Sequence, residues 1–541
     1  MQPLYELLCL CWENGYIPQD MRDAITVTLY KNKGDCSDCN NYRGISLLSI
    51  AGKAFARVSL SRLQKLASRV YPESQCGFRP GRSTTDMIFS LRQMQEKCRE
   101  QQMPLYIAFI DLTKAFDLVS RKGLLEILKK IGCPPRLLKI IASFHENTRN
   151  SVRFKGATSE AFPVGSGVKQ GCVLAPTLFG IFFSLLLQHA FGGCDEGIYL
   201  YTRSDGKLFN IARLRAKSKV KLILIRELLF ADDAAIVSHS VAHLQRLVDR
   251  FAYACKEFGL TISLKKTKVM AQNSDTPPVI TIGGQPLEVV PTFTYLGSTV
   301  SNSVNLDFEL NSRIGKAAGT MAKLNDRVWK NNKLTMRTKL RVYQACVLSS
   351  LLYGSETWTI YKRQERRLNS FHLRCLRRVL HIHWQDKKTN SEVLERADIP
   401  SIFAILSKRR LTWLGHVYRM DPGRIPKDIL YGELAEGCRP VGRPHLRFKD
   451  VCKRDMKQSE IEADKWECYA GDRTKWRSIV REGVVCAEKK RRAEQEVKRM
   501  RRKQHAASSL LPPTADYSCS SCGKICLSRI GLWSHSKQCR K

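Results

Sequence analysis

The sequence predicts an α+β fold up to about residue 305 and a mostly helical arrangement after it. Apolar, β-rich segments and amphipathic helical segments follow one another up to that point, whereas the chain beyond about residue 310 is mostly helical and more basic. The composition, with 43% hydrophobic and 26% charged residues, is that of a globular protein. A chain of 541 residues is long enough for roughly two to four domains.

The charge balance predicts a polyanionic partner. Lysine and arginine together number 90 against 50 aspartates and glutamates, so the formal net charge is +40. This surplus favours nucleic acid, with an anionic membrane surface as the alternative. The longest apolar run, LFGIFFSLLLQHAF from Leu178, is too short and too polar to span a membrane, so no membrane association is expected.

The start of the chain and its cysteines indicate the cellular compartment of the protein. The segment MQPLYELLCLCWENG lacks the basic part of a secretion signal and carries Glu6 and Glu13. Without a secretory route, most of the 20 cysteines are expected to be reduced thiols. A nuclear or cytoplasmic protein is the simplest expectation.

The predicted elements of the α+β part begin with a strand and a basic, polar loop at VTLYKNKGDCSDCNNYRG. In STTD, Ser83 and Asp86 have the spacing of a capping box and predict a helix through SLRQMQEKCRE. PLYIAFIDL predicts a strand that ends at Asp111. A helix at GLLEILKKIG, a strand pair at SVRFKG and SEAFPV, and a loop at GSGVKQG follow.

A long apolar helix is predicted from Thr177, and LILIRELLF and AAIVS predict two strands joined by a turn at ADDA. VAHLQRLVDRFAYACKEFG is then an amphipathic helix with one apolar face: Leu244, Leu247, Val248, Phe251 and Cys255. This mixture favours a sheet with helices on one face.

The helical part is predicted to be strongly basic. RRLNSFHLRCLRRVL places Leu368, Phe371, Leu376 and Val379 on one helix face and arginines around the rest: Arg366, Arg367, Arg374, Arg377 and Arg378. Such arginines indicate either a helix that follows a phosphate backbone or a solvated face. A Pro/Gly/Arg loop at 437–448, a basic helix at 487–505 and a flexible linker at 507–518 follow. The basic helix is a candidate nucleic-acid contact, nuclear import signal or solvated linker.

Asp232 and Asp233 lie side by side between two apolar runs. Like charges in such a place are costly unless they are paired, hydrogen-bonded or bound to a cation. A turn without chemistry is the alternative, because aspartate is common in turns. Asp111, at the end of another apolar strand, adds a third carboxylate. Three carboxylates on adjacent strands can hold two divalent ions, Mg²⁺ or Mn²⁺, for phosphoryl transfer to a 3′-hydroxyl with pyrophosphate as leaving group.

Seven ordered blocks resemble the reverse transcriptases of non-LTR (LINE-type) retrotransposons. They span most of residues 25–300: NYRGISLLS at 41, GFRPGRSTTD at 77, IDLTKAFD at 110, VKQGCVLAPTLF at 168, LLFADDAAI at 228, GLTISLKKTK at 259 and TYLG at 294. One Asp-Asp turn is weak evidence for such an enzyme, whereas seven blocks in order are strong evidence.

The resemblance implies an α+β right-hand polymerase. We expect fingers over 1–105, a palm with the catalytic aspartates over 106–305, a helical thumb over 306–400, a basic helical C-terminal region over 401–510 and a small ββα zinc finger over 515–541. These elements usually also carry a target-nicking endonuclease upstream. Because this chain begins almost at the fingers, we expect either a truncated or repurposed copy or a Met1 that is not the original start.

The resemblance also implies roles for residues near the aspartates. Asp111 and Asp232 match metal ligands, and Asp233 matches the third catalytic carboxylate. Lys266, with Lys265 beside it as the alternative, matches a general acid that protonates the leaving pyrophosphate.

The substrate-binding residues implied by the resemblance lie in three of these blocks and, for Lys31, in the segment before the first block. Lys31 and Arg43 match cations that clamp the triphosphate, and Gln170 and Gly171 match a loop that lines the incoming nucleotide. Phe116 matches a ring that would clash with a ribose 2′-hydroxyl and so favours deoxynucleotides; a core phenylalanine is the alternative.

The residues implied to contact nucleic acid lie in two blocks. Arg79 and Arg82 are expected to contact the template. Tyr295, Leu296 and Gly297 are expected to form a hairpin that grips the primer.

The C-terminal segment predicts a zinc site. Cys519, Cys522, His535 and Cys539 have the spacing C-x2-C-x12-H-x3-C, which suits tetrahedral Zn²⁺. The base-reading positions of its helix would be Ser528, Gly531 and Ser534, which are not strong base readers, so weak or backbone contacts are expected. Cys36 and Cys39 lack a second pair and are expected to be ordinary thiols.

The expected function is an RNA-directed DNA polymerase that extends a DNA 3′-end with dNTPs and Mg²⁺ or Mn²⁺. Its partners would be a template RNA and a DNA primer or nicked target DNA. An RNA-dependent RNA polymerase and a catalytically silent, nucleic-acid-binding retroelement remnant stay open as alternatives. The oligomeric state is unknown from sequence.

Overall fold

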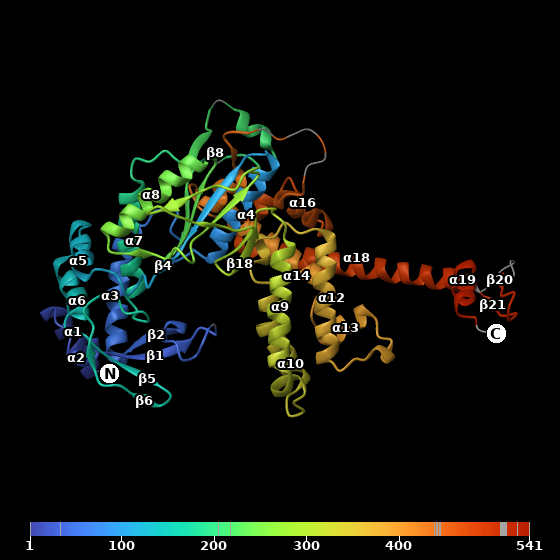
Figure 1. Cartoon of the computed structure of the whole chain (residues 1–541), viewed down its shortest axis with the longest axis horizontal. Helices are drawn as coiled ribbons and strands as arrows, with labels where there is room; N and C mark the ends of the chain where they lie inside the picture. Colours follow the sequence, from blue (N-terminus) through green and yellow to red (C-terminus); the bar gives the residue numbers. More distant parts are fainter. Residues whose placement is uncertain are drawn as a thin grey trace.

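The computed structural model describes residues 2–539 except 33, 204, 217, 438, 440, 441, 443, 444, 509–516 and 527. Parts of the predicted Pro/Gly/Arg loop at 437–448 and most of the predicted linker therefore lie outside the described residues. Figure 1 shows a central sheet from which one group of strands and one group of helices extend downward at opposite ends.

The central sheet has five strands in the order β10-β11-β3-β13-β16. Their bounds are Glu227–Phe230, Asp233–Ser238, Leu105–Ile110, Lys268–Gln272 and Glu288–Val289. All neighbours are antiparallel except β13 and β16, which are parallel. The middle strand β3, LYIAFI, is buried at every residue because both faces of the sheet are covered.

Helices α7 (Ala175–Phe191) and α8 (Val241–Glu257) cover one face of this sheet, as predicted for their apolar residues. The prediction that helices cover only one face is wrong. Helix α4 (Thr84–Glu100), helix α15 (Ile425–Tyr431) and the hairpin of β17 (Thr292–Tyr295) and β18 (Ser298–Ser301) cover the other face. Local periodicity does not reveal this cover, because it predicts a helix or strand without showing which face of a sheet that element packs against, and α15 lies far along the chain.

A second sheet contains β1 (Ala24–Tyr30), β2 (Tyr42–Leu48), β5 (Arg149–Phe154), β6 (Ala157–Thr158) and β7 (Phe162–Pro163). Strand β1 pairs antiparallel with β2 and parallel with β5. The second sheet thus joins segments from both sides of residue 105. Helix α4, which precedes residue 105, packs against the central sheet instead. The predicted boundary between fingers and palm at residue 105 does not separate the two sheets.

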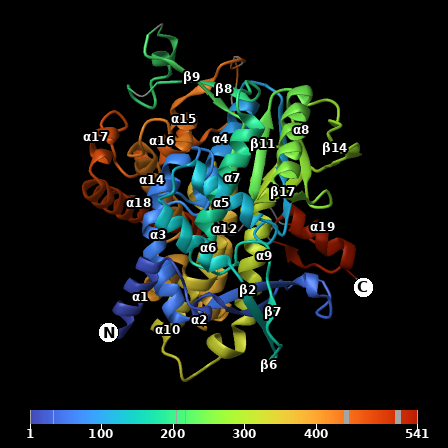
Figure 2. The ribbon, with the colours of Figure 1, turned by 90° about the vertical axis from the view of Figure 1, so that its left-hand side faces the viewer.

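The other helices of this half gather on the side that faces the viewer in Figure 2. Their bounds are α1 Gln2–Asn14, α2 Gln19–Arg22, α3 Ile50–Val70, α5 Arg121–Lys130 and α6 Pro135–His145. The helix predicted at GLLEILKKIG is confirmed as α5.

The capping box predicted for α4 is wrong, although the helix begins where expected. The Ser83 hydroxyl donates to Asp86 Oδ1 at 2.7 Å instead of accepting from the helix backbone. The Asp86 carboxylate does not accept from the backbone N–H of Ser83, because it is buried and pairs with Arg424 at 2.7 Å.

Short strands complete this half, and LILIRELLF is not one strand. It breaks at Arg226 into β9 (Lys221–Ile225) and β10, which lie in different sheets. The smaller sheets pair β9 and β19 (Glu433–Leu434) with β8 (Ile198–Thr202), β4 (Leu112–Thr113) with β12 (Thr261–Ile262), and β14 (Thr281–Ile282) with β15 (Gln285–Pro286).

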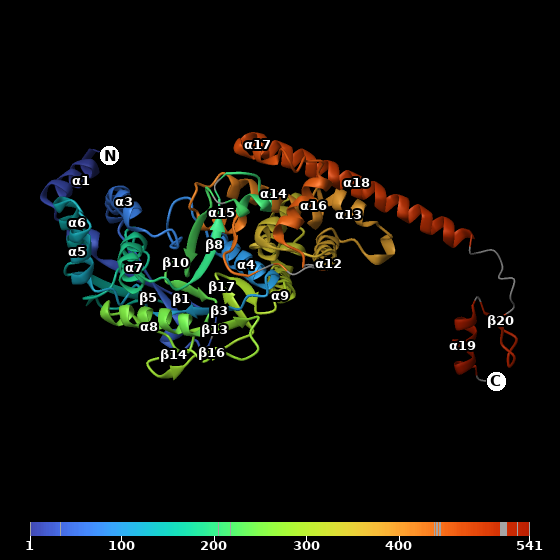
Figure 3. The ribbon, with the colours of Figure 1, turned by 90° about the horizontal axis from the view of Figure 1, so that it is seen from above.

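The rest of the chain up to residue 508 is mostly helical, as predicted. Its remaining helices are α9 Asp307–Lys323, α10 Met336–Val342, α11 Ser349–Leu351, α12 Lys362–Val379, α13 Asn390–Ala397, α14 Ile402–Tyr418, α16 Phe448–Gln458, α17 Trp466–Gly471 and α18 Arg473–Ser508. Short 3₁₀ turns lie at Cys39–Asn41, Ile211–Arg215, Ser355–Thr357 and Trp384–Asp386, and π-helical stretches at Asn325–Trp329 and Tyr343–Leu348. Figure 3 shows α18, which contains the predicted basic helix, running out from the body of the molecule.

Two cores hold the helical part together. The first contains the predicted apolar face of α12, whose Leu368, Leu376 and Val379 are buried. The second packs Phe89 of α4 against Trp413 and Phe448, with ring centroids 5.5 and 5.1 Å apart. The C-terminal region therefore shares a core with the element that covers the central sheet.

The last described elements are β20 (Tyr517–Ser518), β21 (Ile525–Cys526) and α19 (Arg529–Gln538), in the predicted ββα order. None of the described helices is long and apolar enough to cross a membrane.

Candidate active site

The three aspartates meet at one edge of the central sheet. Asp111 directly follows β3, Asp232 lies in the turn before β11, and Asp233 is the first residue of β11. Strands β3 and β11 are antiparallel with Ala234 opposite Ile110, so the register places Asp233 beside Asp111. The structure therefore brings together the carboxylates that the sequence singled out.

Burial and neighbouring charge raise the pKa of two of these carboxyls, Asp232 and Asp233. Desolvation, followed by the charge of Asp111, raises the pKa of Asp232. Desolvation, then the charges of Asp232 and Asp111, raises the pKa of Asp233 to about 6. Arg43 and Lys266 act in the opposite direction on both groups. Three carboxylates close together at strand ends are a donor set that suits a hard divalent cation.

Two of the predicted cations face these aspartates. Lys266 Nζ lies 2.8 Å from Asp111 Oδ2, which favours Lys266 over Lys265 as the functional lysine. Arg43 is an exposed residue of β2, and its charge reaches both Asp232 and Asp233. Lys31 lies elsewhere in the same hairpin, where its ammonium donates to the carbonyl of Asn40 at 2.7 Å.

Gln75 fixes the turn that carries Asp232, a role that no motif in the sequence predicts. Its Nε2 donates to the carbonyl of Ala231 at 3.0 Å, and its Oε1 accepts the N–H groups of Ala231 and Gly77, each at 2.8 Å. Ala231 has a φ of +57°, which is unusual for a residue with a side chain. A Cβ on Gly77 would lie 2.1 Å from the nitrogen of Ala231, so this close approach requires glycine.

Arg79 and Arg82 hold the segment that contains Gln75. Arg79 Nη1 donates to the carbonyls of Pro72 and Gln75 at 2.7 and 3.1 Å. Arg82 makes a two-point ion pair with Glu73, with both distances 2.6 Å. These bonds use Nη1 of Arg79 and both terminal nitrogens of Arg82, and contact of the two guanidinium groups with the template stays a prediction.

Phe116 lies in a row of aromatic rings beside the aspartates. Its half-buried ring stacks on Phe179 with centroids 4.5 Å apart, and Phe78 meets it edge-on at 6.3 Å. Phe78 is 47% exposed and also contacts Phe230, two residues before Asp232. Phe116 thus makes the packing contacts expected of a core phenylalanine. Its aromatic neighbour Phe78 reaches solvent.

Hydrogen bonds and a close backbone approach hold the loop with Gln170 and Gly171 in place at both ends. The carbonyl of Gln170 accepts from Ser46 N–H of β2 at 2.7 Å, and a Cβ on Gly171 would lie 2.7 Å from the Ser46 carbonyl. Gly171 also has a φ of +106°, which glycine alone adopts readily. Before the loop, Arg121 donates to the carbonyls of Val164, Ser166 and Gly167 at 2.7, 3.1 and 3.0 Å.

Tyr295 is a core residue. It is 3% exposed, and its hydroxyl donates to the carbonyl of Leu228 at 2.9 Å. The Tyr295 side chain therefore faces the core, and a grip on the primer by this hairpin stays a prediction. Gly297, at the tip of the β17–β18 hairpin, is exposed with a φ of +78°, so the hairpin itself is accessible and Tyr295 anchors it to β10.

Cys519, Cys522, His535 and Cys539 form the predicted cluster, and their ligand atoms all lie within 4.8 Å of one another. Backbone N–H groups of Ser521 and Cys522 lower the pKa of Cys519 to about 6, which favours the thiolate. The Ser528 hydroxyl accepts from Gly531 N–H at 3.1 Å and caps α19. Cys36 and Cys39 are both exposed and outside this cluster.

Residues 30–300 match the family described as reverse transcriptase (RNA-dependent DNA polymerase). The chain is 25% identical over 382 residues to the RNA-directed DNA polymerase from mobile element jockey of Drosophila melanogaster, covering 68% of this chain and 39% of that protein. It is 26% identical over 357 residues to the probable RNA-directed DNA polymerase from transposon BS of the same organism, covering 64% and 36%.

Among solved structures, the apo telomerase of Candida tropicalis matches 80% of this chain and 74% of that chain, at 11% identity and a TM-score of 0.40. This likeness is weak, and no residue role is taken from it.

Proposed function

The chain belongs to the reverse transcriptase family, and we propose that it is an RNA-directed DNA polymerase that extends a DNA 3′-end on an RNA template. The observation that carries the proposal is the meeting of Asp111, Asp232 and Asp233 at one sheet edge, within the family match over residues 30–300. The resemblance to enzymes of non-LTR mobile elements is confirmed by the relatives. The chain spans 39% of the length of the first of them, so activity, substrates and partners are proposed for this chain and not carried over.

In the proposed reaction, Asp111 and Asp232 would hold the divalent ions, Mg²⁺ or Mn²⁺. Bound ions activate the attacking 3′-hydroxyl and stabilise the leaving pyrophosphate. Asp233 adds negative charge to the same edge. Lys266 holds a proton on Nζ, 2.8 Å from Asp111, where it can be passed to the leaving group.

The substrates follow from the groups around the aspartates. Arg43 reaches the carboxylates from β2 and would bind the triphosphate of a dNTP. The loop with Gln170 and Gly171, fastened to β2, would line the base pair. Phe116 would exclude the ribose 2′-hydroxyl, which supports dNTPs over rNTPs and disfavours the RNA polymerase alternative. Template RNA and a DNA primer or nicked target DNA are the proposed partners.

We also propose that the cysteine and histidine cluster holds one Zn²⁺. Three thiols and one imidazole within 4.8 Å of one another are a donor set typical of structural zinc. The ion would fix the two strands and helix of a small unit that has little apolar core of its own.

Primer extension tests the polymerase proposal. The purified full chain, an RNA template with an annealed DNA primer, dNTPs and Mg²⁺ should give extension products, and Asp232→Asn should give none because the metal loses a charged ligand. The matched control is Asp275→Asn, which changes an exposed aspartate outside the site and should leave extension unchanged. Extension by the Asp232→Asn protein would overturn the metal assignment. Absence of extension by the unchanged protein, with tight RNA binding, would favour the silent remnant.

A further inference from the structure

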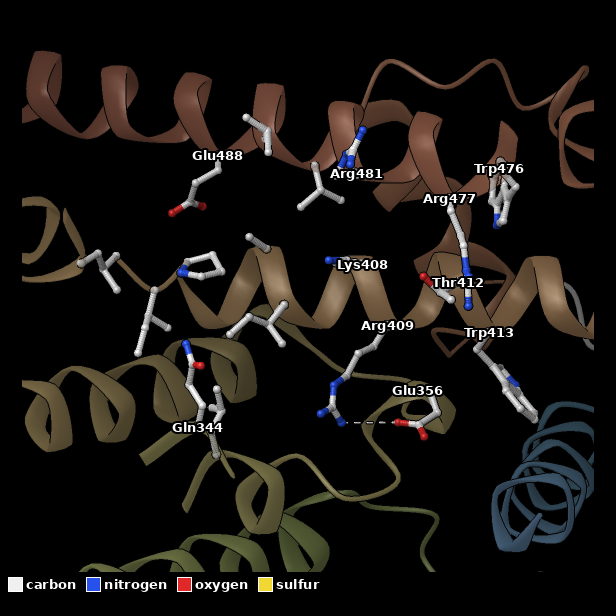
Figure 4. A pocket seen from close by; sticks show the side chains of 18 of the residues that line it. Gln344, Glu356, Lys408, Arg409, Thr412, Trp413, Trp476, Arg477, Arg481 and Glu488 are labelled. Atoms are coloured by element: carbon white, nitrogen blue, oxygen red, sulfur yellow. Dashed lines mark ion pairs between the residues drawn. The ribbon is translucent and has the colours of Figure 1, made fainter. Parts of the chain in front are cut away.

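A large groove lies between α14 and α18, outside the candidate active site. Its volume is about 1150 Å³, and Figure 4 shows Lys408 and Thr412 of α14 facing Arg477 of α18 across it. Its lining is mostly apolar, with Ile399, Pro400 and Ile405 among its residues. The residues that line the groove come from the region after residue 340, so it shares no side chain with the aspartate site.

The rim of the groove carries more positive than negative side chains. The cations are Lys408, Arg409, Arg419, Arg473, Arg477, Arg481, Lys489 and Arg492, and the acids are Glu356, Glu395, Asp398 and Glu488. Three of the four acids already have partners within the groove. Glu356 pairs with Arg409 at 3.7 Å, and Glu395 and Glu488 both pair with Arg492, at 3.2 and 3.4 Å.

Three of the other cations, Arg419, Arg473 and Arg477, lie close together. Burial, then the charges of Arg473 and Arg477, lowers the pKa of Arg419. Burial, then Arg419 and Arg473, lowers the pKa of His416. Among the residues that the structure describes, Lys408, Arg473 and Arg477 form no ion pair. Nearby Asp472 caps α18 by accepting the N–H of Thr474 at 2.7 Å. Such a cluster repels itself, and a bound polyanion would relieve the repulsion.

We propose that this groove is a second nucleic-acid site that binds a single strand, with its phosphates on Lys408, Arg473, Arg477 and Arg481. The apolar lining of the groove favours a single strand over a duplex as the bound nucleic acid. Unpaired bases can lie on an apolar surface, whereas a duplex turns its phosphates outward and keeps its bases stacked inside. The proposal does not depend on polymerase activity, because no residue of the aspartate site takes part.

Helix α18 extends this site beyond the groove. Past Val485 the helix is largely exposed and carries further cations: Lys490, Lys498, Arg499, Arg501, Arg502 and Lys503. A strand that leaves the groove along α18 would meet these residues in turn. This gives the basic run at 487–505 a specific role as the continuation of a nucleic-acid track.

The test uses the full chain with its polymerase site first filled by an excess of a short, unlabelled RNA–DNA duplex. A fluorescent single-stranded oligonucleotide is then titrated in, in RNA and DNA versions of one sequence. Arg473→Glu with Arg477→Glu should weaken binding at least about tenfold and reduce the salt dependence by about 1.4 in log–log slope, because two phosphate contacts are lost. Lys408→Glu, on the opposite wall, should act in the same direction.

The matched control is Lys129→Glu with Lys130→Glu on α5, two exposed lysines at the other end of the molecule (Figure 1). This control makes the same change in charge and should leave single-strand binding unchanged. An equal loss in the control would overturn the proposal, because the effect would then come from net charge alone. Competition by duplex DNA as strong as by the single strand would also overturn it.

Photo-crosslinking locates the bound strand. A photoreactive oligonucleotide should attach to peptides within 399–419 and 473–489, and attachment only to residues 30–323 would overturn the proposal. Both Arg473→Glu and Arg477→Glu leave the aspartate site intact, so extension of a short primer–template should stay at the level of the unchanged protein. If the unchanged protein does not extend primers, the polymerase proposal fails while the crosslinks still decide this one. Preference for RNA would point to a template strand, and preference for DNA to a target strand.

Discussion

The side-chain amide of Gln75 bridges both backbone groups of Ala231, the residue immediately before Asp232. The two hydrogen bonds are 3.0 and 2.8 Å long, and Gln75 is completely buried. The left-handed φ of Ala231 costs an ordinary residue about 1–2 kcal/mol, so the turn needs support from outside itself. The position of Asp232 is therefore fixed by Gln75, which lies 156 positions before Ala231 in the chain.

Replacing Gln75 by leucine should slow extension with little effect on primer–template affinity. The turn loses its support while the surfaces that bind nucleic acid are unchanged, and a displacement of about 1 Å at a reacting centre costs about 10²-fold in rate. Single-turnover extension gives the rate, and a binding titration gives the affinity. Gln93→Leu, a buried glutamine of α4, is the matched control. Equal rates for the two variants would contradict a positioning role for Gln75.

Magnesium binding should depend on pH through Asp233, whose pKa is raised from 3.8 to about 6. Because the folded-state pKa lies above the unfolded-state value, ionisation weakens the metal-free fold above about pH 6, and this penalty disappears as the pH falls toward 3.8. Mg²⁺ needs the ionised form, so its affinity should fall about tenfold per pH unit below 6.

The measurement is the melting temperature with and without Mg²⁺ at about pH 7.5 and about pH 5. Mg²⁺ should raise it at the higher pH and have little effect at the lower. Asp233→Asn should remove the contribution of Asp233 to the pH dependence in the metal-free protein, and Asp275→Asn should leave that pH dependence unchanged. The same Mg²⁺ effect at both pH values would rule out this titration.

Phe116→Ala should admit ribonucleotides. The ring lies beside the aspartates, and its removal opens the space that a 2′-hydroxyl needs, so discrimination against rNTPs should fall by roughly tenfold or more. The ratio of kcat/KM for dNTP and rNTP measures this. Phe116→Tyr keeps the ring and should keep the discrimination, and Phe162→Ala removes an exposed ring of β7 as a control. Unchanged discrimination in Phe116→Ala would assign the ring to packing against Phe179 alone.

The full chain should contain one Zn²⁺, and His535→Ala with Cys539→Ser should contain none, since two of the four ligands are lost. Metal analysis of the purified proteins checks the stoichiometry. Cys36→Ser with Cys39→Ser removes two exposed cysteines outside the cluster and should retain the zinc. Retention of zinc by the first variant, or its loss from the second, would refute the assignment. Extension of a short primer–template should be the same in both.

The sequence predicts those parts of the fold that depend on local pattern. Strand β3 is a continuous apolar run, α8 has a clear helical period, and the Asp-Asp turn lies between two such strands, so all three are found where expected. Of the elements that cover the second face of the central sheet, α15 could not be predicted to do so, because it lies more than 300 residues from β3 in the chain. A single sequence shows no sign of such a contact.

The same limit applies to the site. Asp111, Asp232 and Lys266 stand in recognisable blocks, and the structure brings them together. Arg82 stands in a block too, but its residue type does not show whether the guanidinium faces a nucleic acid or Glu73. Gln75 is the opposite case, because an ordinary polar residue acquires its role only through where the chain folds.

The packing of Phe89 between Trp413 and Phe448 sets a lower limit on how short a working version of this protein can be. Helix α4 covers the central sheet with one face and buries Phe89 in the C-terminal core with the other. An expressed fragment that stops at residue 400 would leave that aromatic surface in water and would invite aggregation. The chain can therefore be shortened from the C-terminal end only within the exposed part of α18. Any copy or engineered enzyme that keeps the polymerase must also keep the C-terminal helices that pack on α4.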